Sequence, residues 1–176
     1  TQGEPALQVD AESAARLGAE PAPPGGGEFV RVRAHDPRLR IDLGAYAKGV
    51  AIDLVLDQLA REGVGEALLN LGGNLGTLAH GSGPGWTIGV RDPFGGGLVA
   101  RVGTRGREAV VTSGIYERTR MVDGQRRGHV LDPRRAEPVQ RLASVTVIHR
   151  DAGLADAAST ALLVAGPHAW RDVAAR

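Results

Sequence analysis

The feature that most restricts how this chain can fold is an abundance of glycine combined with a shortage of aromatic residues. Among 176 residues there are 26 Gly, whereas aromatic side chains make up only 3%. Small side chains must therefore carry the packing, and backbone segments are expected to approach one another closely. Hydrophobic residues make up 42%, an ordinary globular share that excludes a wholly disordered chain. The length suits one compact domain.

Charge and cysteine content exclude several classes of protein. The 21 basic and 20 acidic side chains leave a net charge of +1, which argues against a nucleic-acid binder that neutralises phosphates. The sequence has no Cys, so disulfides, thiolate zinc sites and cysteine nucleophiles are excluded. No apolar run approaches the roughly 20 residues that cross a bilayer. There is no signal peptide, and the start at Thr1 suggests a processed, trimmed or partial chain, so the compartment stays open.

The chain is expected to consist of a peripheral lead-in over residues 1–40 and a core over residues 41–176. Within the lead-in, residues 11–17 favour a short helix. The Pro and Gly residues of 21–27 predict a loop, and the alternating pattern of 28–34 predicts an edge strand.

The core combines helical and strand periodicity. Apolar residues at helical spacing predict a helix over 50–62, and further helices are expected over 153–165 and 168–175. Strands are predicted at 66–71, 86–91, 98–102, 108–112, 129–133 and 144–149. The first of these strands, EALLNL, is expected to be buried. Helix, many strands and then helix indicate a mixed α+β domain.

The segment DLGAYAKG, from Asp42 to Gly49, is the first that could bind a ligand. It stands directly before the 50–62 helix, where free N–H groups favour an anion such as phosphate. Lys48 is the single lysine beside twenty arginines, and in the first helical turn its ammonium would reach a phosphate oxygen. A tight strand-to-helix turn explains the same pattern, and the spacing is not that of a P-loop.

The segment LADAAST at 154–160 places Asp156 and Thr160 four residues apart on one face of a predicted helix. Their Cβ atoms would lie about 5–6 Å apart. A carboxylate and a hydroxyl form a hard, all-oxygen pair suited to Mg²⁺ or Ca²⁺, and Mg²⁺ tolerates few protein ligands because it keeps waters and substrate phosphates. The alternative is a local Asp–Thr contact without a metal.

Two later segments carry hydroxyls and a histidine. In VVTSGIYER, Thr112, Ser113 and Gly114 end a strand with groups that commonly hold phosphate oxygens. In GHVLDP, His129 opens a predicted strand and could act as an acid, a base or a hydrogen-bond donor, or serve structure alone. The segment NLGGNL at 70–75 is either a tight turn or a place where the backbone approaches a ligand closely.

The chain resembles the ApbE family, and the resemblance rests on these segments in this order: DLGAYAKG, NLGGNL, WTIGVRDP, VVTSGIYER, GHVLDP, SVTVI and LADAASTALLVAG. The family comprises the FAD:protein FMN transferases, formerly called thiamine-biosynthesis lipoproteins, and the likeness covers about residues 42–167. It implies an α+β fold of mixed β-sheets with flanking helices. It also implies a Mg²⁺-dependent bacterial enzyme that cleaves the FAD pyrophosphate and releases AMP. The FMN is attached through a phosphoester to a Thr of a target protein of a redox complex.

The resemblance also assigns roles to individual residues. The family's Mg²⁺ ligands fall on Asp156, Thr160 and the backbone carbonyl of Ala45. Positions that contact FAD in the family fall on Asp42, Lys48, Ser113 and Val130. His129 is the residue expected to be essential to transfer, by positioning or deprotonating the acceptor hydroxyl or by protonating the leaving group.

Some positions depart from the family pattern. Ala45 replaces the usual Gly, Asn74 stands where Asp is frequent, and Ser159 stands where some members place another Asp. The family's N-terminal portion, with its Met-Gly-Thr and Phe-Asp-Pro-type segments, is lacking, so a fragment, one part of a split protein or a shortened member is expected. Two alternatives to the transferase therefore stay open: an FAD pyrophosphatase that forms FMN and AMP, and a non-catalytic flavin-binding module.

Overall fold

The structure, a computed structural model, describes residues 18–20, 31–33, 42–79, 85–116, 119–122 and 125–175. It divides into a smaller unit, Thr1–Asp42 with Asp132–Glu137, and a larger unit, Leu43–Leu131 with Pro138–Arg176. In the smaller unit, β1 (Gly18–Glu20) pairs antiparallel with β2 (Arg31–Arg33). The helix predicted over 11–17 and the loop over 21–27 lie outside the described residues, and β2 is the described part of the strand predicted over 28–34. The boundary expected near residue 40 stays a prediction.

The main sheet of the larger unit has the strand order β12-β7-β4-β3, and each neighbouring pair is antiparallel. Its strands are β3 (Glu66–Leu71), β4 (Asn74–Ala79), β7 (Glu108–Gly114) and β12 (Ser144–His149). Two-stranded sheets are formed by β5 (Thr87–Arg91) with β6 (Leu98–Gly103), β8 (Thr119–Val122) with β9 (Gln125–Gly128), and β10 (Leu131–Asp132) with β11 (Glu137–Pro138). The α+β class predicted from the sequence is confirmed.

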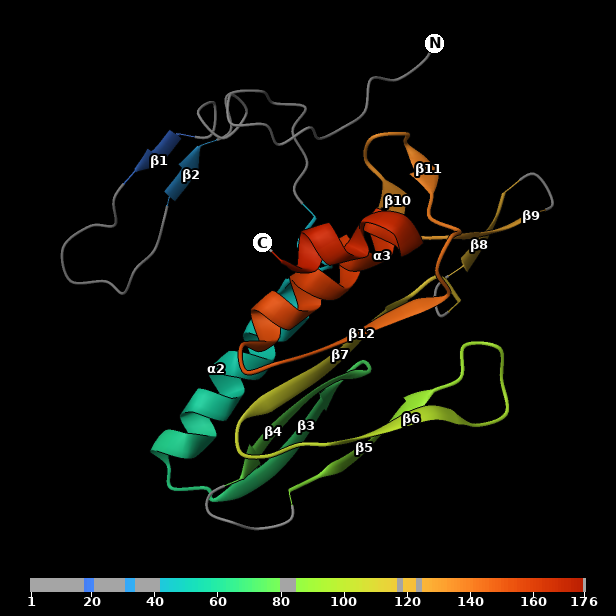
Figure 1. Ribbon diagram of the computed structural model, residues 1–176. Coiled ribbons are helices and arrows are strands. Elements are labelled where there is room, and N and C mark those ends of the chain that lie inside the picture. The colour runs from blue at the N-terminus through green and yellow to red at the C-terminus, as the bar shows by residue number, and fades with distance from the viewer. Residues whose placement is uncertain are drawn as a thin grey trace. The chain divides into compact units, whose positions relative to one another are not determined.

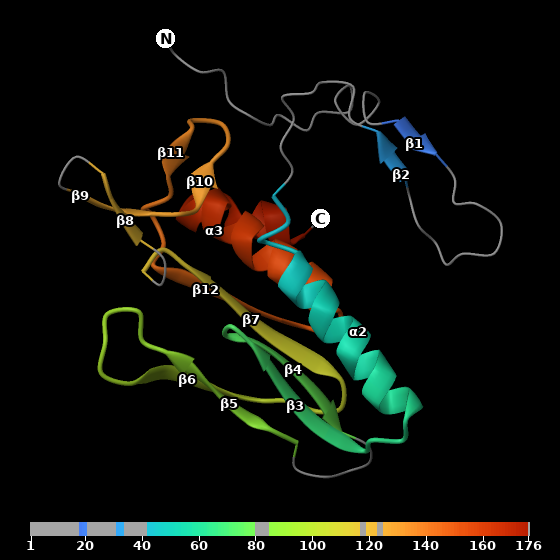
Figure 2. The ribbon, with the colours of Figure 1, turned by 180° about the vertical axis from the view of Figure 1, so that it is seen from behind.

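Two helices, α2 (Ala47–Arg61) and α3 (Ala152–Ala174), lie side by side on one face of the main sheet (Figures 1 and 2). Helix α2 packs on β3 and β4, and α3 packs on β7 and β12. In both views the β5–β6 hairpin lies on the side of the sheet away from the helices. The core between helices and sheet consists of small and aliphatic side chains: Ile52, Leu56, Leu78, Ala109, Val111, Ala152 and Ala155. Neither helix of the described chain has the length and apolarity that a membrane crossing requires.

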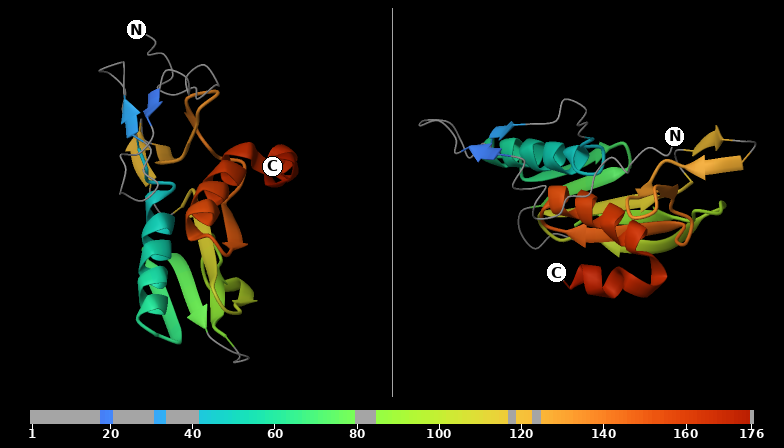
Figure 3. Two further views of the ribbon diagram at one scale, coloured as in Figure 1. Left: turned by 90° about the vertical axis from the view of Figure 1, so that its left-hand side faces the viewer. Right: turned by 90° about the horizontal axis from the view of Figure 1, so that it is seen from above.

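The helices match their predictions closely. Helix α2 begins at Ala47 rather than at residue 50, so Lys48 lies in its first turn as expected. Helix α3 contains a break at Gly166, whose φ of 76° and ψ of −176° are not helical, and Pro167 follows it. The two helices predicted over 153–165 and 168–175 are therefore the two arms of α3, and Figure 3 shows the second arm leaving in a new direction.

The burial expected for the strand EALLNL is wrong. Its residues form β3, but β3 is an edge strand of the main sheet, and its burial alternates before ending in exposed residues. Leu68 and Leu71 are 44% and 39% exposed. An edge strand packs against α2 with one face only, so a run rich in leucine need not indicate burial on both faces.

The segment NLGGNL forms a tight hairpin turn, which confirms one of its two interpretations. Gly72 and Gly73 connect β3 to β4 with φ values of +59° and +91°, and Leu71 lies opposite Asn74 in the ladder. Two consecutive positive φ values define the type I′ turn, whose twist suits a hairpin. The side chain of Asn70 reinforces the turn by accepting a hydrogen bond of 3.0 Å from the Gly73 N–H.

Candidate functional site

The candidate site lies where the N-terminal turns of α2 and α3 meet. Gly49 in α2 faces the backbone of α3 so closely that a Cβ on it would lie 2.1 Å from the Ala152 carbonyl oxygen and 2.7 Å from Gly153 Cα. Only a residue without a side chain permits this approach. The glycine content of the chain is therefore used here to bring two helix starts together.

Each helix start supplies a hydrogen-bond acceptor to the other. The Gly49 N–H of α2 donates to Asp156 Oδ2 of α3 over 3.1 Å, and the Gly153 N–H of α3 donates to Asp53 Oδ2 of α2 over 2.9 Å. The first N–H groups of a helix have no partner within it, so these carboxylates satisfy donors that would otherwise be unpaired. Both also place negative charge at the positive end of a helix dipole. We call this pair of bonds the reciprocal caps.

Asp156 is the buried acidic group of the site. Its side chain is 2% exposed, and besides the Gly49 N–H it faces the ammonium of Lys48, whose Nζ lies 3.5 Å from Oδ1. Lys48 Nζ also donates to the Gly44 carbonyl oxygen over 3.1 Å. The turn before α2, the lysine and the buried carboxylate are thus joined in one network of polar contacts. The resemblance to the ApbE family had placed Lys48 and Asp156 in a single site, whereas the spacing within each segment had not.

Hydroxyl groups continue the site along α3. Ser113 of β7 lies with its Oγ 2.7 Å from Ser159 Oγ and 3.0 Å from Thr160 Oγ1. Ser159 in turn donates to the Asp156 carbonyl oxygen over 2.9 Å. The structure therefore brings Lys48, Ser113, Asp156 and Thr160, all predicted site residues, into one network.

The oxygen atoms of the site fit a hard cation that also keeps water molecules and substrate phosphates as ligands. Asp156 offers a carboxylate, Thr160 a hydroxyl, and the exposed turn that contains Ala45 offers backbone carbonyls beside the Gly44 carbonyl that Lys48 reaches. No cluster of three His, Cys, Asp or Glu side chains occurs within the described residues. A single carboxylate is too little for a closed calcium or zinc site, but it suits Mg²⁺, which retains waters and binds substrate phosphates.

The expectation that free N–H groups at the start of α2 bind an anion is not met at Ala47 and Gly49. The Ala47 N–H donates to the Leu43 carbonyl over 2.8 Å, and the Gly49 N–H is occupied by Asp156. Within the first turn, the charge available to an anion is therefore mainly that of the Lys48 ammonium.

The remaining predicted residues lie on other segments. Asp42 is exposed and belongs to the smaller unit. His129 is exposed at a bend between β9 and β10, and not inside a strand as expected, because β10 begins only at Leu131. Val130 is half-buried, and its carbonyl oxygen accepts from the Val139 N–H over 2.9 Å. The roles expected for Asp42, His129 and Val130 stay predictions.

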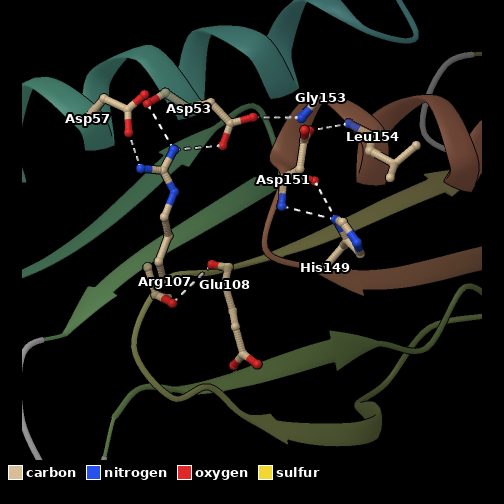
Figure 4. A network of polar contacts seen from close by, with 9 residues as sticks. Asp53, Asp57, Arg107, Glu108, His149, Asp151, Gly153 and Leu154 are labelled. Atoms are coloured by element: carbon tan, nitrogen blue, oxygen red, sulfur yellow. Dashed lines mark hydrogen bonds and ion pairs between the residues drawn. The ribbon is translucent and has the colours of Figure 1, made fainter.

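Asp53 is a structural part of the site that sequence reasoning missed. Its Oδ2 accepts from the Gly153 N–H, and its Oδ1 lies 3.1 Å from Arg107 Nη2. Arg107 Nη1 pairs with Asp57, one turn further along α2 (Figure 4). Burial alone would lower the pKa of Arg107, but its hydrogen bonds to Asp57 and Asp53 raise that pKa above the ordinary value. The arginine thus ties the start of β7 to α2, and Asp53 extends the link to α3. The only signal in the sequence was the acidic pair at helical spacing.

A similar local pair stabilises the turn between β10 and β11. The hydrogen bond from the Arg134 guanidinium lowers the pKa of Asp132 below its ordinary value. Arg134 Nη2 lies 2.8 Å from Asp132 Oδ2, and the Arg134 N–H donates to Oδ1 over 3.0 Å. The aspartate of the GHVLDP segment is therefore engaged in holding its own turn.

Comparison with known proteins identifies the family. The model of the ApbE family matches residues 6–176. The chain belongs to the ApbE family. It is 46% identical over 146 residues to an FAD:protein FMN transferase of Rhodobacter capsulatus, a match that covers 82% of this chain and 28% of that protein. A transferase of the same name from Escherichia coli is 34% identical over 144 residues, covering 80% of this chain and 41% of the relative.

Solved ApbE structures share the fold. The ApbE protein of Thermotoga maritima superposes with a TM-score of 0.68 at 39% identity, covering 76% of this chain and 44% of that one. The flavin transferase ApbE of Vibrio cholerae gives a TM-score of 0.69 at 30% identity, covering 85% and 48%. This ApbE-family chain thus spans less than half the length of these relatives.

Proposed function

We propose that the chain acts as a Mg²⁺-dependent FAD:protein FMN transferase. The observation that carries this proposal is Asp156, a carboxylate that is 2% exposed on a helix rich in alanine and leucine. Burying a carboxylate is costly unless it is paired, and here the Lys48 ammonium stands 3.5 Å away with Thr160 one turn along the helix. A cation, a buried anion and a hydroxyl at one point are suited to phosphoryl-type transfer.

The proposed reaction joins FAD to a Thr of a target protein of a redox complex. The Thr hydroxyl oxygen attacks the phosphorus on the FMN side of the pyrophosphate, and a new P–O bond forms. The bond from that phosphorus to the bridging oxygen breaks, and AMP leaves with the bridging oxygen and its electron pair. The hydroxyl proton is lost, so the products are the phosphoester-linked FMN and AMP.

Two kinds of group in this chain would act on the pyrophosphate: the oxygen atoms that would bind Mg²⁺, and the ammonium of Lys48. Asp156, Thr160 and the Ala45 carbonyl would bind Mg²⁺, which supplies neutralisation of the charge on the pyrophosphate oxygens. Lys48 would pair with a phosphate oxygen, moving there from its present contacts with the Gly44 carbonyl and Asp156.

The other predicted residues are proposed to act on the flavin nucleotide and the acceptor. Asp42, Ser113 and Val130 are proposed to lie at positions that contact FAD. His129 is proposed to handle the proton of the reaction, at the acceptor hydroxyl or at the leaving group. The residue itself is exposed at the bend between β9 and β10.

The test is incubation of the purified chain with FAD and Mg²⁺, with and without an acceptor peptide that bears a Thr. AMP release is measured by chromatography, and flavin attachment by the mass of the peptide. We expect a Mg²⁺-dependent mass gain that is abolished by EDTA and by Asp156→Ala. The matched control is Asp57→Ala, which removes a half-exposed carboxylate elsewhere on α2 and should retain activity.

The other outcomes separate the alternative functions. AMP formed equally without the peptide would indicate a pyrophosphatase that uses water as the acceptor. Retained flavin without any AMP would overturn the transferase in favour of a flavin-binding module. Unchanged turnover in Asp156→Ala would remove the metal assignment.

A further inference from the structure

We propose that Ser113 is a positioning residue that fixes the direction of the Thr160 hydroxyl, so that its oxygen lone pairs are left for the cation. The inference rests on the proposed function, because it concerns the Mg²⁺ ligand Thr160. It deepens that function by giving Ser113 a task in addition to the contact with FAD proposed above. It follows from counting the donors and acceptors of the hydroxyl cluster.

The Asp156 carbonyl fixes the direction of the first hydrogen bond in the cluster. A carbonyl oxygen can only accept, so in its 2.9 Å contact with Ser159 the hydroxyl of Ser159 must donate. A serine hydroxyl has one proton, and this contact uses it. Ser159 is 0% exposed, so water does not compete for that proton.

The remaining directions follow one after another. In the 2.7 Å contact between Ser113 and Ser159, the proton of Ser159 is already committed, so Ser113 must donate. In the 3.0 Å contact between Ser113 and Thr160, the proton of Ser113 is then committed, and Thr160 must donate. All three hydrogen bonds thus point in one direction: Thr160 donates to Ser113, Ser113 to Ser159, and Ser159 to the backbone carbonyl of Asp156.

This direction matters because a metal ligand must present lone pairs. With its proton turned to Ser113, Thr160 keeps its acceptor sites free and presents no proton to a cation. Without Ser113 the hydroxyl would be free to rotate, and one orientation would point its proton at the metal. Partners that orient a ligand in this way typically contribute about 10–100-fold in metal affinity.

The strand that carries Ser113 is suited to such a task. Ser113 pairs with Val145 of β12 in the regular β7–β12 ladder, and α3 packs on both strands. The orienting hydroxyl therefore stands on the sheet, whereas the ligand that it orients stands on the helix. The series of hydrogen bonds ends at the carbonyl of Asp156, whose carboxylate is the other ligand proposed on α3. Both proposed ligands therefore belong to one fixed unit.

The test measures binding of Mn²⁺, used as a spectroscopic substitute for Mg²⁺, by electron paramagnetic resonance titration of the free metal without FAD. Ser113→Ala is expected to weaken Mn²⁺ binding by roughly 10-fold. Ser113→Thr keeps a hydroxyl and should restore affinity to within about 3-fold of the original protein. The matched control is Thr112→Val, because the neighbouring Thr112 hydroxyl bonds only Thr146 among the described contacts, over 2.9 Å, and its loss should leave Mn²⁺ affinity unchanged.

A second variant tests the direction in which these hydroxyl groups donate. Ser159→Ala removes the group that takes the proton of Ser113, yet Thr160 can still donate to Ser113, so Mn²⁺ affinity should fall less than in Ser113→Ala. Undiminished Mn²⁺ affinity in Ser113→Ala, or a loss of melting temperature without a loss of affinity, would overturn the inference. Absence of Mn²⁺ binding in the original protein would instead overturn the proposed metal site, and with it the proposed function.

Discussion

Replacing Gly49 by Ala tests the close meeting of the two helix starts. The added Cβ would stand 2.1 Å from the Ala152 carbonyl oxygen, 2.5 Å from the carbonyl carbon and 2.7 Å from Gly153 Cα. All three atoms belong to the backbone, so no side chain can rotate away. To reach the 3.0 Å below which Cβ contacts are essentially never found, the helix ends must separate by roughly 1 Å.

Such a separation would cost both strain and hydrogen bonding. Overpacking typically costs about 1–3 kcal/mol, and loss of the 3.1 Å bond from the Gly49 N–H to the Asp156 carboxylate costs about 1.5–3 kcal/mol. The gain in helix propensity from Gly to Ala returns about 1 kcal/mol. The net loss is about 3 kcal/mol, which for a chain of this size lowers the melting temperature by roughly 6–12 °C.

The assay is thermal unfolding followed by circular dichroism, with Gly65→Ala as the matched control. A Cβ on Gly65 would meet nothing within 4 Å, so that variant should melt within about 2 °C of the original protein. A Gly49→Ala variant as stable as the control would refute the reasoning, because it would mean that the helix starts are not held at the distance described.

Two further predictions concern charged residues near the reciprocal caps. Lys48→Ala should weaken FAD binding about 10-fold, which isothermal titration would detect. It should lower the melting temperature by about 2–4 °C, because the buried Asp156 carboxylate loses its cation but keeps its hydrogen bond from the Gly49 N–H. A larger loss of stability with unchanged FAD affinity would make Lys48 structural. Asp53→Ala should cost about 1–2 kcal/mol in urea unfolding, because it removes a cap from α3. Asp57→Ala should cost less than about 1 kcal/mol, because Asp57 is 48% exposed, and equal losses in both variants would contradict the capping role.

The parts of the fold that could be predicted from the sequence are those determined locally. The spacing of Ile52, Leu56 and their neighbours predicts α2 because one helix face is buried, whatever it packs against. The exposure of β3 could not be predicted, because it depends on strand order: β4 pairs with β7 on its other side, and β3 is left at the edge. A run of apolar residues does not reveal how many neighbours a strand has.

The same distinction applies to the candidate site. Lys48, Asp156 and Thr160 were found because their segments have recognisable content and, for the last two, helical spacing. Asp53 and Ser159 were missed as parts of the site because their partners lie far away in sequence. The Gly153 N–H is 100 positions from Asp53, and Ser113 is 46 positions from Ser159.

The reciprocal caps have a consequence for the order in which the molecule assembles. The bond from Gly49 to Asp156 closes a span of 107 residues, and all four strands of the main sheet lie within that span. Long-range contacts form only after the entropy of closing the intervening chain has been lost, so the first turns of both helices become complete late in folding. The region that would bind the nucleotide is then expected to be among the first to open in the native protein. A bound ligand would close both helix starts in a single step, and the stability gained on binding would extend to segments far apart in the chain.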